Sequence, residues 1–194
     1  MRRFAVICDM EFRLFVRDFF GFFFALVFPV LMLLLFGGIF GNEPVYDGAD
    51  IGMMDVTVPA YAVMVTGVTG LMSLPLTLAG YKEKKIYKSF DATPVGKKNI
   101  ISAQVFVNLV MTLIGISILL IAGRILYHIQ INGDFLSICV GIFLSIGAMF
   151  SMGFFLTAIG RDLKSTNMLC YLIYFVMLFL SGATMPDQMF PDTM

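Results

Sequence analysis

Residues 19–40 read FFGFFFALVFPVLMLLLFGGIF and contain no charged side chain. About 20 consecutive apolar residues are enough for a helix to cross a bilayer. Similar apolar runs follow, and they cover residues 58–80, 100–122, 135–160 and, in a shorter form, 166–182. Of the 194 residues, 59% are hydrophobic and 13% are charged, which is about half the charged fraction of a typical soluble domain. The sequence therefore predicts an all-α polytopic membrane protein with five transmembrane helices.

The segment before the first span, residues 2–18, reads RRFAVICDMEFRLFVRD and alternates charged and apolar residues at helical spacing. On a helical wheel the charged residues gather on one side and the apolar residues on the other: Arg2, Arg3, Asp9, Arg13 and Arg17 against Phe4, Ile7, Cys8, Phe12 and Phe15. This pattern predicts an amphipathic helix that lies in the membrane interface. Glu11 falls on the apolar face, so its carboxylate either reaches sideways to water or pairs with a basic group of a neighbouring segment.

The basic residues lie mostly on one side of the predicted membrane. Twelve of the 13 belong to the N-terminal helix, to residues 81–98 or to the short connection that begins at Arg161. Arg124 is the exception, and residues 43–55 carry four acids and no Lys or Arg. Lys and Arg are retained on the cytoplasmic side of membrane proteins. We therefore expect a multi-pass protein of the plasma membrane with its N-terminus and residues 81–98 in the cytosol.

The sequence lacks the common motifs of catalysis and ion coupling. There is one histidine, His128, and the three cysteines have no metal-ligand spacing. No HExxH, GxSxG or GxxxxGK[ST] motif occurs, so we expect neither an enzyme nor a cofactor bound by this chain. The net charge of zero gives no reason to expect nucleic acid. An ion-coupled secondary transporter would need an ionisable residue at mid-membrane, which no span provides; a membrane assembly protein that transports nothing is a further alternative.

Two of the predicted spans carry a stripe of uncharged polar residues. In the second span these are Thr66, Thr69, Ser73 and Thr77, and in the third they are Gln104, Asn108 and Thr112 at intervals of four. Hydroxyl and amide groups in lipid need partners, and hydrogen bonding between helices is the usual solution. The stripes are therefore either helix-packing contacts or the lining of a transport path. Gln104 and Asn108 are the strongest candidates for the path, because an amide facing lipid is costly.

Residues 81–96 read YKEKKIYKSFDATPVG and resemble one segment of the ABC-2 type permeases, the membrane subunits of ATP-driven exporters. That segment follows their second span and reads like YREKGILKRLRATPVS. The positions that match are Tyr81, Glu83, Lys84, Ile86, Lys88, Ala92, Thr93, Pro94 and Val95. Lys85 stands where glycine is usual, and Gly96 stands where serine is usual. The order of the spans and the sidedness of charge agree with this resemblance over the whole chain.

The resemblance implies that residues 81–98 form a coupling loop that touches a separate ATP-binding subunit. The residues assigned to this contact are Lys82, Glu83, Lys84, Lys85, Lys88, Thr93 and Pro94. A separate set of candidate residues lies on the interfacial helix: Glu11, Arg13 and Arg17. ATP and Mg²⁺ would be used by that partner. The chain would pair with a second permease, as a homodimer or a heterodimer, within membrane lipid, and the cargo would be a drug, a lipid or a glycan-like molecule.

The family also implies six spans and an outer hairpin similar to residues 179–191, so we expect that a sixth span is missing and that the chain is truncated. Within the loop we expect a short helix at residues 82–90. A turn should follow at Thr93-Pro94, because a proline disfavours a helical backbone at the residue before it.

Overall fold

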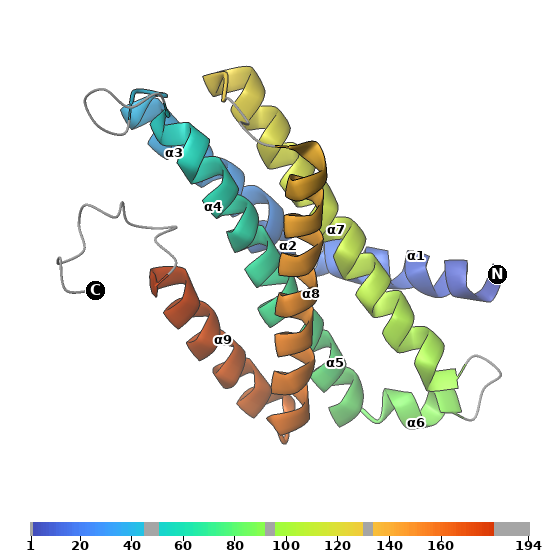
Figure 1. The fold of residues 1–194 in the computed structure, drawn as a ribbon. Coiled ribbons are helices and arrows are strands. Elements are labelled where there is room, and N and C mark those ends of the chain that lie inside the picture. The colour runs from blue at the N-terminus through green and yellow to red at the C-terminus, as the bar shows by residue number, and fades with distance from the viewer. Residues whose placement is uncertain (1, 45–50, 92–95, 130–133, 181–194) are drawn as a thin grey trace.

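The computed structural model of the protein describes residues 2–44, 51–91, 96–129 and 134–180. The elements in chain order are α1 (Arg2–Arg17), α2 (Phe19–Phe22), η1 (Phe23–Val27), α3 (Phe28–Phe40), α4 (Met53–Gly67), η2 (Val68–Ser73), α5 (Leu74–Glu83), α6 (Ile86–Asp91), α7 (Gly96–Tyr127), α8 (Phe135–Ile159) and α9 (Leu163–Leu180). The segments η1 and η2 are π-helical. Figure 1 shows a helical bundle, and the described part of the chain contains no β-strand. The predicted all-α membrane fold is confirmed.

In the part of the chain that the structure describes, four continuous helical stretches are long and apolar enough to cross a membrane. They are the 22-residue Phe19–Phe40, the 31-residue Met53–Glu83, the 32-residue Gly96–Tyr127 and the 24-residue Leu136–Ile159. The helix α9 is a shorter apolar helix whose first turn carries polar residues, and at ~1.5 Å per residue its 18 residues extend about 27 Å. The second and third stretches begin before and end after the predicted runs 58–80 and 100–122. Helical hydrogen bonding continues through polar residues, whereas an apolar run marks only the part that lipid covers.

Two of the spans contain a π-helical turn directly before a proline. The segment η1 precedes Phe28-Pro29, and η2 precedes Leu74-Pro75. A proline has no N–H to donate, and its ring collides with the carbonyl four residues earlier. In both spans that carbonyl belongs to the π-helical turn, where the helix carries an extra residue and is wider. Both prolines are accommodated in this way without ending the span.

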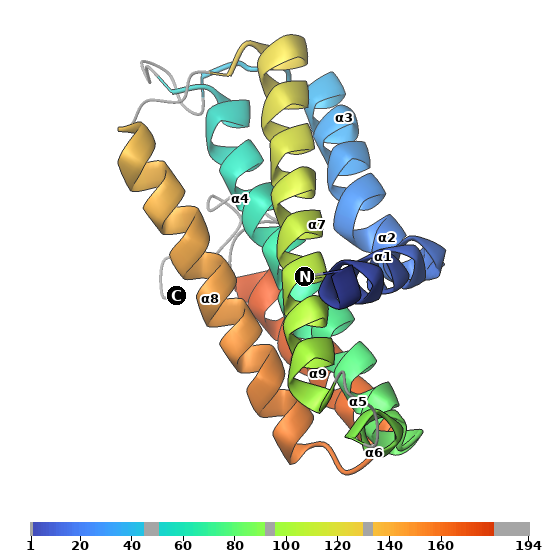
Figure 2. The same cartoon turned by 90° about the vertical axis from the view of Figure 1, so that its right-hand side faces the viewer.

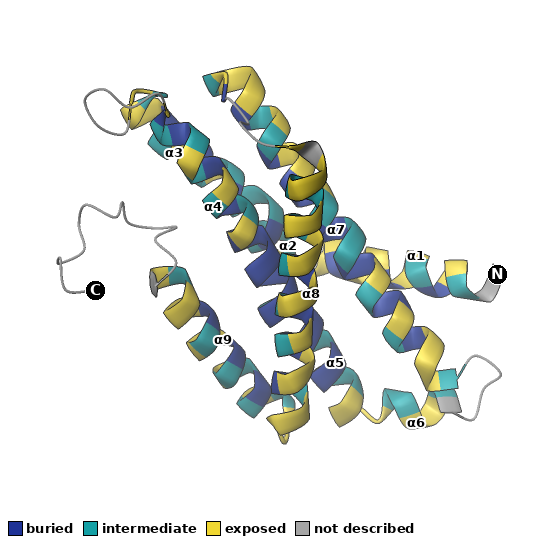
Figure 3. Cartoon of the chain, in the orientation of Figure 1, coloured by how far each residue is buried: buried dark blue, intermediate teal, exposed yellow. Residues whose placement is uncertain are grey.

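The stretch α4–η2–α5 is the centre of the bundle. In its most apolar window 72% of the residues are buried, against 17% in the windows of Phe19–Phe40 and of α8. Figure 3 shows the same contrast, with buried residues gathered on α4 and α5 and exposed residues covering much of α8. The helices α3, α7, α8 and α9 pack around this centre. The apolar side chains that they turn outward can face acyl chains, which are as apolar as leucine.

The N-terminal helix α1 lies crosswise to the spans at the side of the bundle, against α7 and α2 (Figures 1 and 2). Its buried residues form one stripe at intervals of four: Ile7, Glu11 and Phe15. On the exposed side Arg13 Nε lies 2.9 Å from Asp9 Oδ2. Phe12, which was expected on the apolar face, is 42% exposed. The stripe that packs on α7 is therefore narrower than the apolar face read from the helical wheel.

The predicted continuous helix at residues 82–90 is wrong. The helix α5 ends at Glu83 and α6 begins at Ile86, with a turn at Lys84-Lys85 between them. The turn expected at Thr93-Pro94 lies outside the described residues, as does the predicted outer hairpin beyond residue 180.

Candidate functional site

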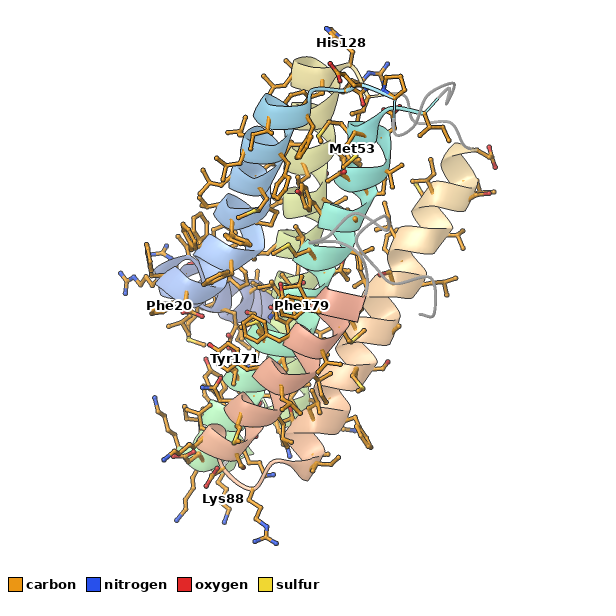
Figure 4. All side chains as sticks on the ribbon, turned by 90° about the vertical axis from the view of Figure 1, so that its left-hand side faces the viewer. Phe20, Met53, Lys88, His128, Tyr171 and Phe179 are labelled. Atoms are coloured by element: carbon orange, nitrogen blue, oxygen red, sulfur yellow. The ribbon has the colours of Figure 1, made fainter. Side chains whose placement is uncertain are left out.

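The lysine-rich segment from Tyr81 to Lys98 forms one end of the bundle. The 32 residues of α7 extend about 48 Å at ~1.5 Å per residue, which is more than the roughly 30 Å hydrocarbon core of a bilayer. A helix of this length extends beyond the hydrocarbon at one or both of its ends. The lysine side chains of residues 81–98 are exposed, and they are Lys82, Lys84, Lys85, Lys88, Lys97 and Lys98. Figure 4 shows side chains with terminal nitrogen atoms gathered at the end marked by Lys88, opposite the end marked by His128.

The turn at Lys84-Lys85 sets the direction of α6. Lys85 has a φ of 56°, in the left-handed region that favours glycine. The backbone N–H groups of Lys84 and Lys85 donate to the carbonyls of Gly80 and Lys82 at 3.0 and 3.2 Å. A left-handed residue that closes a helix in this way is a common C-terminal cap, usually made by glycine. The glycine expected at position 85 from the family resemblance therefore has a conformational reason.

Glu11 ties α1 to the lysine-rich end. Its side chain is 4% exposed, and its Oε1 accepts hydrogen bonds from the hydroxyl of Tyr81 at 3.0 Å and from Nε2 of Gln104 at 3.5 Å. Both expectations for Glu11 are wrong, because the carboxylate is buried away from water and its donors are a phenol and an amide rather than a basic group. Burial raises the pKa of the Glu11 carboxyl above its ordinary value, and the two hydrogen bonds oppose that rise.

Gln104 extends these contacts to α6. Its side chain is 1% exposed, and its Oε1 accepts a hydrogen bond from the hydroxyl of Tyr87 at 3.3 Å. The rings of Tyr81 and Tyr87 meet edge to face with centroids 5.9 Å apart, and Nζ of Lys97 lies 5.3 Å from the centre of the Tyr87 ring, within cation–π range. Glu11, Tyr81, Tyr87 and Gln104 form one polar cluster, the Glu11 network, which joins α1, α5, α6 and α7.

A second set of contacts joins α5 to the connection between α8 and α9. Glu83 Oε2 accepts a hydrogen bond from the backbone N–H of Leu163, the first residue of α9, at 2.7 Å. Nζ of Lys82 donates to the carbonyl of Gly160, which directly follows α8, at 3.3 Å. A carboxylate at a helix N-terminus satisfies a free N–H group and interacts favourably with the helix dipole. We call Lys82 and Glu83 with these two backbone partners the α5 clasp.

The start of α9 is also capped by its own residues. Asp162 Oδ1 accepts a hydrogen bond from the backbone N–H of Ser165 at 2.7 Å, and Ser165 Oγ accepts from the N–H groups of Arg161 and Asp162 at 3.1 and 3.2 Å. The hydrogen bond from the Ser165 backbone lowers the pKa of the Asp162 carboxyl. Because the first turn is fixed locally, a contact from α5 acts on an ordered helix end rather than on a frayed one.

The polar stripes of the second and third spans meet inside the bundle. All of their named members except Thr77 are buried: Thr66, Thr69, Ser73, Gln104, Asn108 and Thr112. The hydroxyl of Thr112 donates to Oγ1 of Thr69 at 2.7 Å, which links α7 to η2. Nδ2 of Asn108 donates to the carbonyl of Gln104 at 2.9 Å, and its Oδ1 has no hydrogen-bond partner among the described residues. The Thr69–Thr112 bond is a helix-packing contact, and a path-lining role for the stripes stays a prediction.

Sequence reasoning missed most of the partners in this region. It gave no role to Tyr87, Gly160 or Leu163, and it used Tyr81 only as a matching position. The tyrosines carried a usable signal, because a buried phenol hydroxyl usually finds a hydrogen-bond partner. Gly160 and Leu163 carried none, since they take part through backbone groups that every residue has. Glu83 was expected to face another protein, yet its carboxylate is engaged within the chain.

The described part of the site offers exposed cations and contacts that anchor it to the bundle. No group of three His, Cys, Asp or Glu that could hold a metal ion occurs among residues 2–44, 51–91, 96–129 and 134–180. The site instead presents exposed cations on a short helix whose two flanks are anchored to other helices. Such a site can bind a partner and pass on a displacement.

Comparison with known proteins adds one finding. A family model described as ABC-2 type transporter matches residues 2–194. No curated protein and no solved structure matches the chain.

Proposed function

Because this chain belongs to the ABC-2 type transporter family, we propose that it is the permease subunit of an ATP-driven exporter and that the ATP-binding subunit docks on residues 81–98. Members of the family generally work with a separate ATP-binding subunit. That partner would bind Mg²⁺ and ATP, and the permease would provide the path. Two permease chains, identical or homologous, would enclose a path for a drug, a lipid or a glycan-like cargo.

One observation supports this proposal above all: the lysine-rich end is anchored to the bundle on two sides. The Glu11 network holds it to α1 and α7, with Tyr81 and Gln104 both bonded to Glu11. The α5 clasp holds it to the start of α9, through Glu83 and Leu163. A push on α6 would therefore reach α7 and α1 through Tyr87, Gln104 and Glu11, and would reach α9 through the neighbouring helix α5. A loop whose lysines served only to keep it on the cytoplasmic side of the membrane would need neither of these two sets of contacts.

The docking surface is formed by the exposed lysines that the anchors leave available. Lys82 reaches Gly160 and Lys97 lies over the ring of Tyr87, whereas Lys84, Lys85 and Lys88 are exposed on the turn and on α6. The partner should therefore offer an acidic surface. Complementary charge across an interface speeds association and excludes partners of the wrong sign.

We place the lysine-rich end in the cytosol of a cell whose plasma membrane the protein spans. The retention of Lys and Arg on the cytoplasmic side supports this orientation. It would put the N-terminus and the connection at Arg161 on the same side as the partner. Labelling of Lys88→Cys by a membrane-impermeant thiol reagent on intact cells would contradict the orientation.

The test is copurification of the ATP-binding subunit with the tagged permease in detergent, followed by measurement of ATP hydrolysis. Lys88→Glu should weaken the complex about tenfold or more, because a like-charge contact costs several kcal/mol. Arg124→Glu is the matched control, since Arg124 is also exposed and lies at the opposite end of α7. An ATPase that binds both variants equally, or no ATPase in the purified wild-type complex, would contradict docking at this site.

Docking and coupling can be separated with Glu83→Ala. This change removes the bond to Leu163 and leaves the three exposed lysines in place, so the partner should still copurify. ATP hydrolysis should continue while transport falls, because the clasp no longer carries the movement to α9. If transport per ATP is unchanged, the clasp has no role in coupling.

A further inference from the structure

The helix α8 touches the centre of the bundle most closely at one crossing point. A Cβ placed on Gly153 would collide with the carbonyl oxygen of Gly70 in η2, and a Cβ on Gly70 would come within 3.0 Å of the Met149 backbone. Small residues of this kind let two helices approach at backbone distance in membranes. From this crossing towards its N-terminal end, α8 leans away from α4 and α7, as Figure 2 shows.

The divergence of α8 opens a cavity of about 510 Å³ in the half of the bundle opposite the lysine-rich end. Its lining comes from the length of α4, the C-terminal half of α7 and the N-terminal half of α8, with Ile51 and Ile129 beside them. The volume falls within the range of roughly 300–1,000 Å³ that is usual for ligand pockets. The cavity is therefore large enough to hold a ligand, and it is larger than the small voids left by imperfect packing.

The lining is almost entirely hydrocarbon. Among its 14 residues only Asp55, Thr66 and Ser145 are polar. The hydroxyl of Thr66 already donates to the carbonyl of Ala62 at 2.9 Å, and Asp55 accepts the N–H of Gly52 at 3.0 Å. Away from Asp55 the lining offers water few of the two to four polar partners that it needs. The occupant must therefore be apolar.

The cavity is continuous with the lipid-facing surface. Its rim residues Val56 and Val63 on α4 are 54% and 43% exposed, and a Cβ added at Gly141 on α8 would meet no atom within 4 Å. Both helices belong to stretches long and apolar enough to cross the membrane. A groove that opens sideways within a bilayer is in contact with acyl chains. We propose that this cavity is a binding site for one acyl chain of a membrane lipid.

The site goes beyond the proposed function, since it depends on the bilayer and not on an ATP-binding partner. An acyl chain that moves from lipid into the cavity gains no hydrophobic transfer energy, because lipid tails are as apolar as leucine, so its preference for the cavity comes from van der Waals contacts. A chain held between three helices makes more contacts than one lying on a convex helix. Lipid should therefore occupy the cavity saturably, in contrast to the exchange expected over the rest of the surface.

The sequence contains no tryptophan, so single tryptophans can report on the site. Val56→Trp places the reporter at the rim of the cavity, and Val140→Trp on α8 is the control, with a similar exposure of 49% at a position outside the lining. The purified protein in detergent is titrated with a phospholipid that carries bromine on its acyl chains, which quenches nearby tryptophan. Quenching at Val56→Trp should saturate at low lipid, whereas quenching at Val140→Trp should be weak and rise without saturation.

A filled cavity provides the second arm of the test. Gly141→Phe, in the Val56→Trp background, puts a ring into open space beside the cavity and should remove the saturable part of the quenching, because the ring takes the place of part of the acyl chain. Gly147→Phe is the matched control, because a Cβ at Gly147 also meets no atom within 4 Å and Gly147 does not line the cavity. Equal quenching at the two reporters, or no effect of Gly141→Phe, would overturn the proposal. Complete shielding of Val56→Trp from the brominated lipid would also overturn it, since protein would then cover the cavity.

Discussion

The hydrogen bond between Tyr81 and Glu11 should account for a measurable share of the stability of α1 on the bundle. Tyr81→Phe removes the hydroxyl that lies 3.0 Å from Oε1 of Glu11 and leaves the ring in place. A hydrogen bond to a charged group contributes about 1.5–3 kcal/mol, and Glu11 is only 4% exposed, so solvent weakens it little. For a chain of this size about 1 kcal/mol shifts the melting temperature by roughly 2–4 °C. We expect Tyr81→Phe to melt about 3–12 °C lower.

The assay is thermal unfolding of the purified protein in one detergent, as a double-mutant cycle of Tyr81→Phe and Glu11→Gln. Glutamine keeps an acceptor oxygen at position 11 and removes the charge, so the partner at position 81 should matter less in that background. The stability lost in the two single variants should therefore add up to more than the stability lost in the double variant. The difference is the coupling energy, and we expect it to be about 1 kcal/mol or more. Strictly additive effects would show that the 3.0 Å contact carries no coupling and would refute this reasoning.

The same carboxyl predicts a pH dependence of stability. Burial raises the pKa of Glu11 above its ordinary value of 4.5 in the folded protein. Between the unfolded pKa and the raised folded pKa, the folded state binds more protons than the unfolded state. The stability that Glu11 contributes is therefore present at low pH and is lost as pH rises through the folded pKa. Melting temperature measured against pH should show this slope in the wild type and lose it in Glu11→Gln; an unchanged slope would assign it to another group.

Three further changes test separate features. Lys85→Gly should raise the melting temperature, because it removes a left-handed strain of about 1 kcal/mol from a residue with a φ of 56°; a lower melting temperature would contradict that strain. Glu83→Ala should speed hydrogen exchange at the Leu163 amide by about tenfold, since a hydrogen bond to a charged group of roughly 1.5 kcal/mol is lost; unchanged exchange would mean that the clasp is open in solution. Thr112→Val should cost about 0.6 kcal/mol, the average for bonds between membrane helices, and Thr69→Val should cost less in that background than by itself, because both changes remove the 2.7 Å contact between the two hydroxyls; strictly additive losses would exclude a contribution from that contact.

Much of the fold could be predicted because the forces that set it are local. A helix crosses lipid when about 20 consecutive residues are apolar, and that sum is read directly from runs such as residues 19–40. The crosswise α1 followed from the spacing of charge before that run. The break at Lys84-Lys85 could not be predicted in the same way, because a lysine in the left-handed region goes against its own preference and is held there by the elements on each side.

The candidate site divides in the same way. The sequence already showed the lysines at positions 84, 85 and 88 and the single glutamate, Glu83, that lies among them. It did not show the partner of that glutamate, because Leu163 offers a backbone N–H that no side-chain pattern announces. The Tyr81 and Gln104 partners of Glu11 lie 70 and 93 residues along the chain, so only the packing of α1 against α5 and α7 brings them together.

The sequence by itself determined which segments are long and apolar enough to cross a membrane and where along the chain the basic residues collect, because transfer into lipid is a sum over neighbouring residues. The tertiary structure decided the rest. It gave a buried carboxylate two neutral donors, joined the two basic connections through Lys82 and Glu83, and opened a cavity where α8 leans away from its crossing at Gly70 and Gly153. Each of these depends on the distance between helices, and that distance is set by packing over the whole bundle rather than by any one stretch of sequence.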